Sequence, residues 1–228
     1  MSWGFAATVI AIAAIIMLYF WAQKAAVSSK EIVLLAALTA IAALGRIPFA
    51  AIPSVQPTTF IIMLSGCIFG PQAGFMVGAS AALVSNFFLG QGPWTPWQMI
   101  AWGLVGAGTA YFYRFWRGSK PVGLALLGLL WGYIFGWIQN LGFWLAFVYP
   151  LSMRSFVATY AASIVFDSLH AACNFCLCLV LAIPFLKILQ EYQEKTSYHV
   201  LPVEDNTFNK KDVEQKGSNS DNTIKSHK

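Results

Sequence analysis

The chain has 228 residues, of which 58% are hydrophobic and 10% are charged, and its mean hydropathy is +0.64. A soluble domain averages about 25% charged residues, so this composition excludes an ordinary soluble fold and predicts an all-α, polytopic transmembrane helical bundle. The formal net charge is +5, but the basic excess lies within residues 1–187, where it sets membrane topology, and no basic stripe with interleaved aromatic residues indicates a nucleic-acid partner.

Hydrophobic runs predict seven transmembrane spans, over residues 4–22, 31–48, 57–70, 73–90, 97–114, 122–149 and 155–187. The first run lacks the basic start and the cleavage pattern of a signal peptide, so we interpret it as a retained helix. The third is short for a full crossing, and a re-entrant segment is the alternative. If all seven cross, six basic residues lie on one side and two on the other, which predicts an outer N-terminus and a cytoplasmic C-terminus.

The chain divides into three predicted parts. Residues 1–29 form an extra N-terminal helix with a cytoplasmic linker, and residues 30–187 form the membrane domain. Residues 188–228 are polar and contain few apolar side chains, so we expect a disordered cytoplasmic tail.

Three predicted loops face outward, at 46–56, 89–97 and 148–155. The first two are rich in Pro, Gly and Gln, and the second also carries Trp94 and Trp97. Pro and Gly mark fixed turns, so these loops could be lids over a cavity that opens outward. The tryptophans could instead be membrane-interface anchors.

Asp167 lies about halfway along the last apolar run and is one of two acidic residues before the tail. A carboxylate at that depth costs about 2.5–3.5 kcal/mol, so it is expected to face a polar cavity or a partner. One helix face carries it together with other polar residues, namely Tyr160, Ser163, His170 and Asn174. This face is typical of the wall of a polar site inside a membrane protein.

Small residues recur every four positions in two predicted helices, a spacing that lets membrane helices approach closely. One ladder runs through Gly74 and Gly78 to Asn86, and the other runs through Gly132 and Gly136 to Asn140. Each Asn either joins helices or lines a pocket where the helices splay. A shorter track at Ala36 and Ala40 either packs internally or docks another membrane subunit.

Enzyme chemistry has little support in this sequence. It contains no HExxH motif, no GxSxG elbow and no phosphate-binding loop, and its four cysteines fit apolar helix faces. We therefore expect a protein that is not an enzyme and that carries no cofactor or metal. Two other classes stay open: a stand-alone proton-coupled transporter that uses Asp167 and His170, and an intramembrane enzyme.

The stretch from GRIPFAAIPSVQPTT through GPQAGF to SNFFLGQGPWTPWQ resembles the substrate-binding S components of energy-coupling factor (ECF) vitamin transporters. Among these, the cobalamin-type members are the most similar, and the resemblance covers about residues 30–187. It implies a six-helix core, to which the helix at 4–22 is an addition. It also implies a solute, here cobalamin, a related corrinoid or another vitamin, bound near the outer face beneath the loops at 46–56 and 89–97.

The resemblance further implies a bacterial multi-pass cell-membrane protein that works with a scaffold transmembrane subunit and two cytoplasmic ATPases. The loaded S component would topple in the bilayer and present its solute to the inside. Ala36 and Ala40 match the motif that docks the scaffold. The residues expected to bind solute are Arg46, Gln56, Asn86, Gln91, Trp94, Trp97, Gln98, Asn140, Asp167 and His170.

Overall fold

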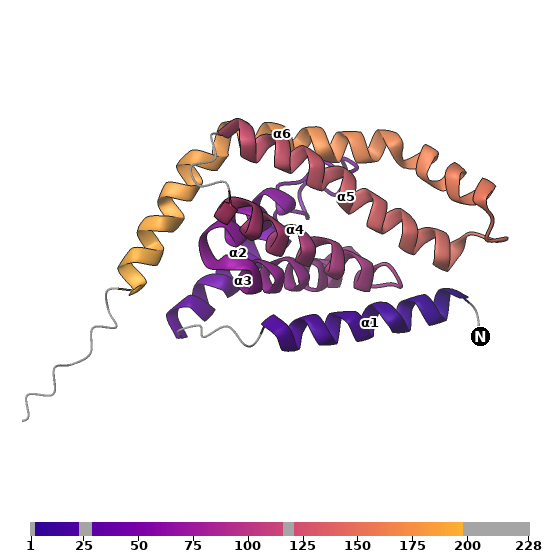
Figure 1. Ribbon diagram of the computed structural model, residues 1–228, viewed down its shortest axis with the longest axis horizontal. Helices are drawn as coiled ribbons and strands as arrows, with labels where there is room; N and C mark the ends of the chain where they lie inside the picture. Colours follow the sequence, from indigo (N-terminus) through magenta and orange to yellow (C-terminus); the bar gives the residue numbers. More distant parts are fainter. Residues whose placement is uncertain (1–2, 23–28, 116–120, 198–228) are drawn as a thin grey trace, which may run out of the picture. The chain divides into compact units, whose positions relative to one another are not determined.

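The computed structural model describes residues 3–22, 29–115 and 121–197, and over these ranges it contains helices and no strand (Figure 1). Within these ranges six helices follow one another: α1 Trp3–Ala22, α2 Ser29–Leu44, α3 Thr58–Leu89, α4 Thr95–Phe115, α5 Pro121–Phe147 and α6 Met153–Ser197. By length and apolar composition, three helices in the described ranges, α3, α5 and α6, can cross a membrane.

Helix α3 contains two of the predicted spans, 57–70 and 73–90, joined at a break. Gly70 has φ 86° and ψ −179°, a conformation that glycine adopts without steric cost, and Pro71 follows it. The chain reverses direction at this break. The evidence is that a methyl group on Gly74 would lie 2.8 Å from the Cα of Gly66, so the segments before and after Gly70 pack against each other. The structure therefore has six helices where the sequence predicted seven spans, with α3 bent into a hairpin.

The two small-residue ladders mark the closest helix contacts. A methyl group on Gly74 would also lie 2.8 Å from the carbonyl of Gly106, so α3 and α4 pack backbone to backbone. On the other ladder, a methyl group on Gly132 would lie 2.6 Å from the backbone nitrogen of Ala171, so α5 packs against α6 in the same way. Both ladders perform the packing role expected of small residues in membrane helices.

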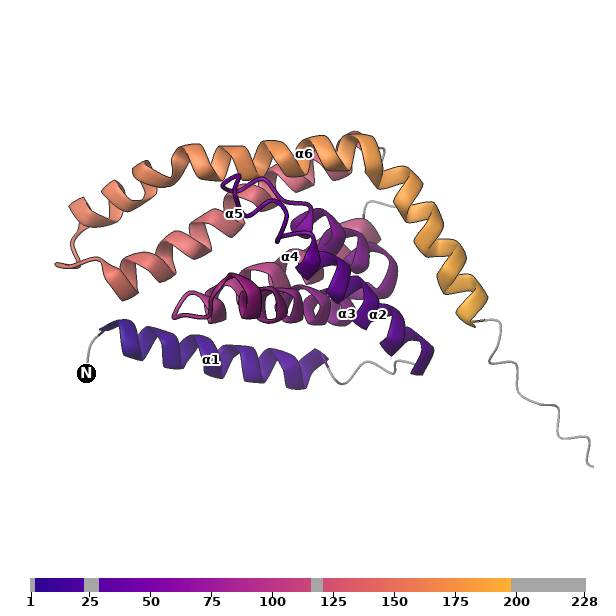
Figure 2. The same ribbon diagram turned by 180° about the vertical axis from the view of Figure 1, so that it is seen from behind.

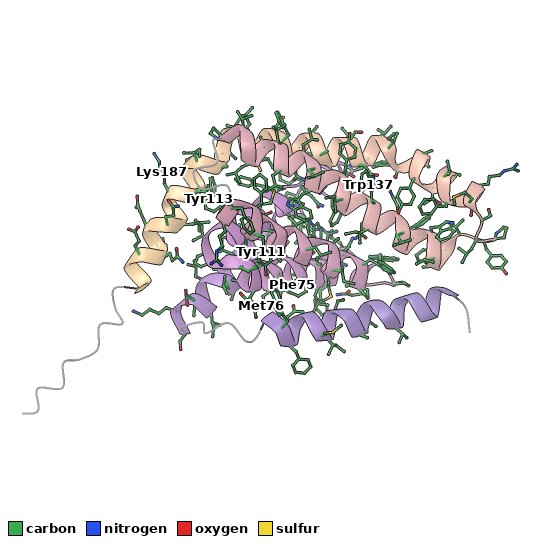
Figure 3. The ribbon with its side chains drawn as sticks, viewed as in Figure 1. Phe75, Met76, Tyr111, Tyr113, Trp137 and Lys187 are labelled. Carbon is green, nitrogen blue, oxygen red and sulfur yellow. The ribbon has the colours of Figure 1, made fainter. Side chains whose placement is uncertain are left out.

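Helix α1 packs on the α3 hairpin through aromatic contacts. Tyr19 and Trp21 meet the ring of Phe75 edge to face, at centroid distances of 5.9 and 6.4 Å. Phe75, which is labelled in Figure 3, is fully buried. The Tyr19 hydroxyl is 2.8 Å from Ser80 Oγ. The extra helix is thus attached to the bundle by specific contacts.

The C-terminal end of the membrane domain differs from the prediction, and parts of the predicted tail and linker lie outside the described residues. Helix α6 continues to Ser197, ten residues past the predicted end of the membrane domain. The predicted disordered tail covers residues 188–228; residues 188–197 of it are helical, and residues 198–228 lie outside the described ranges. Residues 23–28 of the predicted linker also lie outside the described ranges.

Candidate solute-binding site

A cavity of about 540 Å³ lies between the loop at 45–57 and helices α4, α5 and α6. Figure 2 shows this loop extending from the α2–α3 end toward α5 and α6. The volume falls within the ~300–1,000 Å³ typical of small-molecule sites. Its polar and charged lining residues are Arg46, Ser54, Gln56, Gln98, Gln139, Asn140, Ser163, Asp167 and His170.

Arg46 brings a positive charge to this cavity from the loop. Its side chain is 9% exposed, Nη1 donates to Ser85 Oγ and to Asn86 Oδ1 at 2.9 Å, and Nε donates to Gln56 Oε1 at 3.3 Å. Burial lowers the pKa of Arg46 to about 10, so the guanidinium stays charged at neutral pH. Among the described residues Nη2 has no hydrogen-bond partner, which leaves it available to an anionic or acceptor group of a solute.

Stacked rings form a rigid side of the cavity behind Arg46. The guanidinium lies 4.8 Å from the ring centroid of Trp102, Trp102 lies 4.7 Å from Phe135, and Phe135 lies 5.1 Å from His170. Trp102 is fully buried. A cation over an indole face is favourable, and stacked rings resist rearrangement, so this side of the cavity is preorganised.

His170 holds the loop and is not free for a solute. Its Nδ1 lies 3.0 Å from the carbonyl oxygen of Ser54, and its Nε2 lies 3.0 Å from Thr59 Oγ1, which also accepts from Trp102 Nε1 at 2.9 Å. Because a carbonyl can only accept, the neutral ring carries its proton on Nδ1, and Nε2 accepts from the Thr59 hydroxyl. His170 is 3% exposed, and it positions the cavity cover.

Asp167 supplies the acidic group. Its Oδ2 accepts from Ser163 Oγ at 2.9 Å and from Asn140 Nδ2 at 3.1 Å. A methyl group on Gly136 would lie 2.5 Å from the Asp167 carboxyl carbon, so glycine makes room for this side chain on α5. Arg46 and Asp167 line the same cavity without an ion pair between them, and this arrangement suits a solute that carries both donor and acceptor groups.

A second cavity of about 460 Å³ adjoins the first. Its lining is mostly aromatic and consists of Trp94, Trp97, Gln139, Asn140, Gly142, Phe143 and Phe147. Gln139 and Asn140 line both cavities. The tryptophans of the predicted lid thus border this second space.

The structure places eight of the ten predicted solute residues at the two cavities. Arg46, Gln56, Gln98, Asp167 and His170 line the first cavity, Trp94 and Trp97 line the second, and Asn140 lines both. The other two, Asn86 and Gln91, line neither. Asn86 donates to Thr95 and Gln98 and accepts from Arg46, whereas exposed Gln91 donates to the Leu83 carbonyl.

Sequence reasoning missed the aromatic lining. Trp102, Phe135, Phe49 and Phe166 line the first cavity, but in a chain with 15% aromatic residues no pattern separates them from core or lipid-facing side chains. Asn174 shows the opposite case. It shares the polar face of α6 but does not line the cavity, and it is fully buried with both amide atoms unpaired in the described chain.

Ala36 and Ala40 lie on the exposed side of α2 and line a groove of about 380 Å³ between α2 and α3. The α3 side includes Met76 and Ser80, and Ser80 is the partner of Tyr19 from α1. The groove is almost entirely apolar, which suits a membrane helix as its occupant.

Comparison with known proteins places this architecture in a family. Residues 26–191 match the family model described as ECF-type riboflavin transporter, S component. The chain is 30% identical over 123 residues to a UPF0397 protein of Vibrio atlanticus (strain LGP32), covering 46% of this chain and 67% of that protein. It is 31% identical over 84 residues to a UPF0397 protein of Aliivibrio fischeri (strain MJ11), covering 35% of this chain and 45% of that protein.

No solved structure matches the chain. The family match includes every residue that lines the two cavities, since these lie between Arg46 and His170. The chain therefore belongs to the family of ECF-type riboflavin transporter S components.

Proposed function

We propose that this chain captures a vitamin-sized solute from outside the cell in the 540 Å³ cavity and delivers it by docking to an ATPase-driven scaffold. The observation that carries the proposal is the pair of charged residues, Arg46 and Asp167, held in one cavity without an ion pair between them. Buried charges that are not paired with each other are expensive, and a solute that meets them supplies the missing partners.

The lining favours a compact, flat vitamin. Phe49, Phe135 and Phe166 offer ring faces, and the amide, hydroxyl and charged groups offer donors and acceptors. Riboflavin, named in the family description, is a solute of this kind. A corrinoid, which the sequence resemblance favours, is much larger and would need both cavities and an outward movement of the loop at 45–57.

The direct test is to purify the full chain in detergent and identify by mass spectrometry the small molecule that stays bound. Binding of that molecule is then measured without ATP, and uptake is measured in proteoliposomes with and without the scaffold and ATPases. Tight binding without ATP, and uptake only with the partners, support the proposal. Uptake by the chain alone that follows the proton gradient and stops in Asp167→Asn would establish a proton-coupled transporter, and turnover of the solute would establish an enzyme.

The proposed scaffold contact is at the groove around Ala36 and Ala40. Replacing both by Trp fills the groove, so we expect solute binding to persist and co-purification with the scaffold to be lost. Ala37→Trp is the matched control, because Ala37 is exposed on the same helix and does not line the groove. Retention of the scaffold by the double variant would overturn this assignment.

A further inference from the structure

A groove of about 360 Å³ lies between α2, the first half of α3 and the last part of α6, and it is called the α6 groove below. Every residue that lines it is apolar, and none lines the solute cavities or the groove around Ala36 and Ala40. Helices α3 and α6 can cross a membrane, so the α6 groove opens to lipid. Its occupant can have no group that needs a hydrogen bond there.

The α6 side of this groove is an apolar stripe. Leu177, Leu181, Phe185 and Leu189 recur every four residues and line the groove, and Tyr192 follows on the same helix face. From Leu177 to Tyr192 the stripe is about 22 Å long along the helix, at 1.5 Å per residue. One leaflet contributes about 15 Å to the hydrocarbon core of a bilayer, so the stripe can follow an acyl chain through a whole leaflet.

The opposite face of this part of α6 is polar. Lys187, Gln190, Glu191 and Glu194 are all exposed there, whereas Tyr192 lies at the end of the apolar stripe. Tyrosine is enriched where lipid meets water, and an amphipathic segment is typical of that level. Tyr192 therefore marks the membrane interface, and the α6 groove begins below it.

The last turns of α6 bend toward the end of the bundle where α2 begins (Figure 1), and two contacts join them to α3. The rings of Phe60 and Phe185, which both line the groove, meet edge to face at a centroid distance of 5.7 Å. Gln193 Nε2 donates to the carbonyl oxygen of Ile68 at 3.1 Å. A transmembrane helix is about 10–12 Å across and would have to break these contacts to enter. A single acyl chain is narrower, and both contacts can stay.

We propose that the α6 groove binds one acyl chain of a membrane phospholipid whose headgroup lies at the level of Tyr192. Inside a bilayer the gain comes from van der Waals packing, because an unfilled groove leaves its lining without contact atoms. The bound chain holds the end of α6 against α2 and α3. This site is separate from solute capture and scaffold docking, so it stands or falls independently of the proposed function.

The test counts the phospholipid that stays on the full chain after bulk lipid has been washed away in mild detergent, by native mass spectrometry. We expect the unaltered chain to retain a single phospholipid. Ile41→Trp and Ile188→Trp each fill the groove from its rim, where the side chains are 54% and 55% exposed. An indole takes the space of the acyl chain, so retention should fall about 5- to 150-fold, the range that overpacking implies.

Val33→Trp on α2 and Val180→Trp on α6 are the matched controls. Both valines are 69% exposed, lie on the same helices and do not line the groove, so both variants should retain phospholipid as the unaltered chain does. Dioleoylphosphatidylcholine added to the lipid-stripped protein provides a second readout. It should raise the melting temperature of the unaltered chain and of the controls, but not that of the groove variants.

Three outcomes would overturn the proposal. One is that the unaltered chain retains no phospholipid, and another is that all variants retain it equally, which indicates general lipid contact. The third is that a protein subunit co-purifies and is released by Ile41→Trp and Ile188→Trp, which identifies a helix as the occupant. If either groove variant fails to fold, as judged by its elution profile and helical circular dichroism, the other decides.

Discussion

The α3–α4 half and the α5–α6 half of the bundle are built on the same sequence pattern but end differently. Each has a glycine ladder that brings two helix backbones together, and each ladder ends in an asparagine. In the first half, Asn86 is 1% exposed and its amide is fully used by Arg46, Thr95 and Gln98. In the second half, Asn140 holds Ser163 and Asp167 and borders both cavities.

The difference lies in what the ladder packs against. On α3, Gly74 meets the backbone of Gly106, so the contact is tight and leaves no space. On α5, Gly132 also meets backbone, that of Ala171, but Gly136 one turn later meets the flexible side chain of Asp167, and a cavity opens at that level. The same spacing thus makes a structural anchor in one half and a cavity wall in the other.

Arg46 is held by the α3–α4 half and lines the cavity that the α5–α6 half borders, and its removal should have the largest effect. Arg46→Met deletes the donors to Ser85 and Asn86 and the charge that faces the cavity. Hydrogen bonds to charged groups contribute about 1.5–3 kcal/mol, so solute affinity should fall about 10- to 150-fold. Arg46→Lys keeps the charge without the planar fork and should be intermediate. Unchanged affinity of Arg46→Met in a titration would remove this residue from the site.

The two ladders can be compared with one alanine in each. Gly74→Ala forces a methyl group into the backbone of Gly106. Overpacking of this kind costs about 1–3 kcal/mol of folding stability, so the melting temperature should fall. The protein that remains folded should keep its solute affinity. Gly136→Ala displaces only the Asp167 carboxylate, so affinity should fall while the melting temperature changes little. Thermal unfolding and titration of both variants check the contrast, and the opposite pattern would refute it.

Replacing the asparagine at the end of each ladder, Asn86 or Asn140, compares the two halves in the same way, with a smaller expected effect. Asn86→Leu leaves Arg46 Nη1 and Thr95 without an amide partner in a buried place, which costs about 1–3 kcal/mol of stability. Asn140→Leu removes one donor to Asp167 at the cavity wall and should mainly weaken solute binding. Equal losses of stability in both would mean that the two asparagines have the same role.

Asn174 offers the smallest predicted effect, and in the opposite direction. Its amide is buried without a partner among the described residues, on the α6 face that carries His170 one turn earlier and Asp167 two turns earlier. Replacing an unpaired buried amide by an apolar group of similar size removes a desolvation cost, so Asn174→Leu should stabilise the protein by about 1 kcal/mol. A lower melting temperature in Asn174→Leu would show that a partner such as an ordered water satisfies the amide.

Much of the fold follows from sequence pattern because the bilayer constrains it. Apolar runs of helical length indicate the helices, and glycine spacing predicts which faces pack closely. The run at 57–70 and the run at 73–90 were separable because Gly70 and Pro71 interrupt them, although the structure continues them as one bent element. Helix α6 exceeded its predicted end because polar residues after Lys187 still extend a helix that begins in the membrane.

The cavity lining was predictable where a polar residue is out of place in lipid. Asp167 and Asn140 attract notice for that reason, and both border the first cavity. Asn86 gives the same signal in the sequence but is used for structure, since its partners come from residues 46, 95 and 98. Periodicity shows that a side chain faces inward, and it does not show whether space or another side chain meets it there.

The sequence by itself determined the membrane class, the helical elements, the close-packing faces and the polar face of α6, because each depends on composition or on spacing within one segment. Tertiary structure alone decided that Trp102 and Phe135 stack behind Arg46, that His170 holds the carbonyl of Ser54, and that two cavities meet at Gln139 and Asn140. These features join residues up to 116 positions apart in the chain, and only the packing of helices against one another fixes such distances.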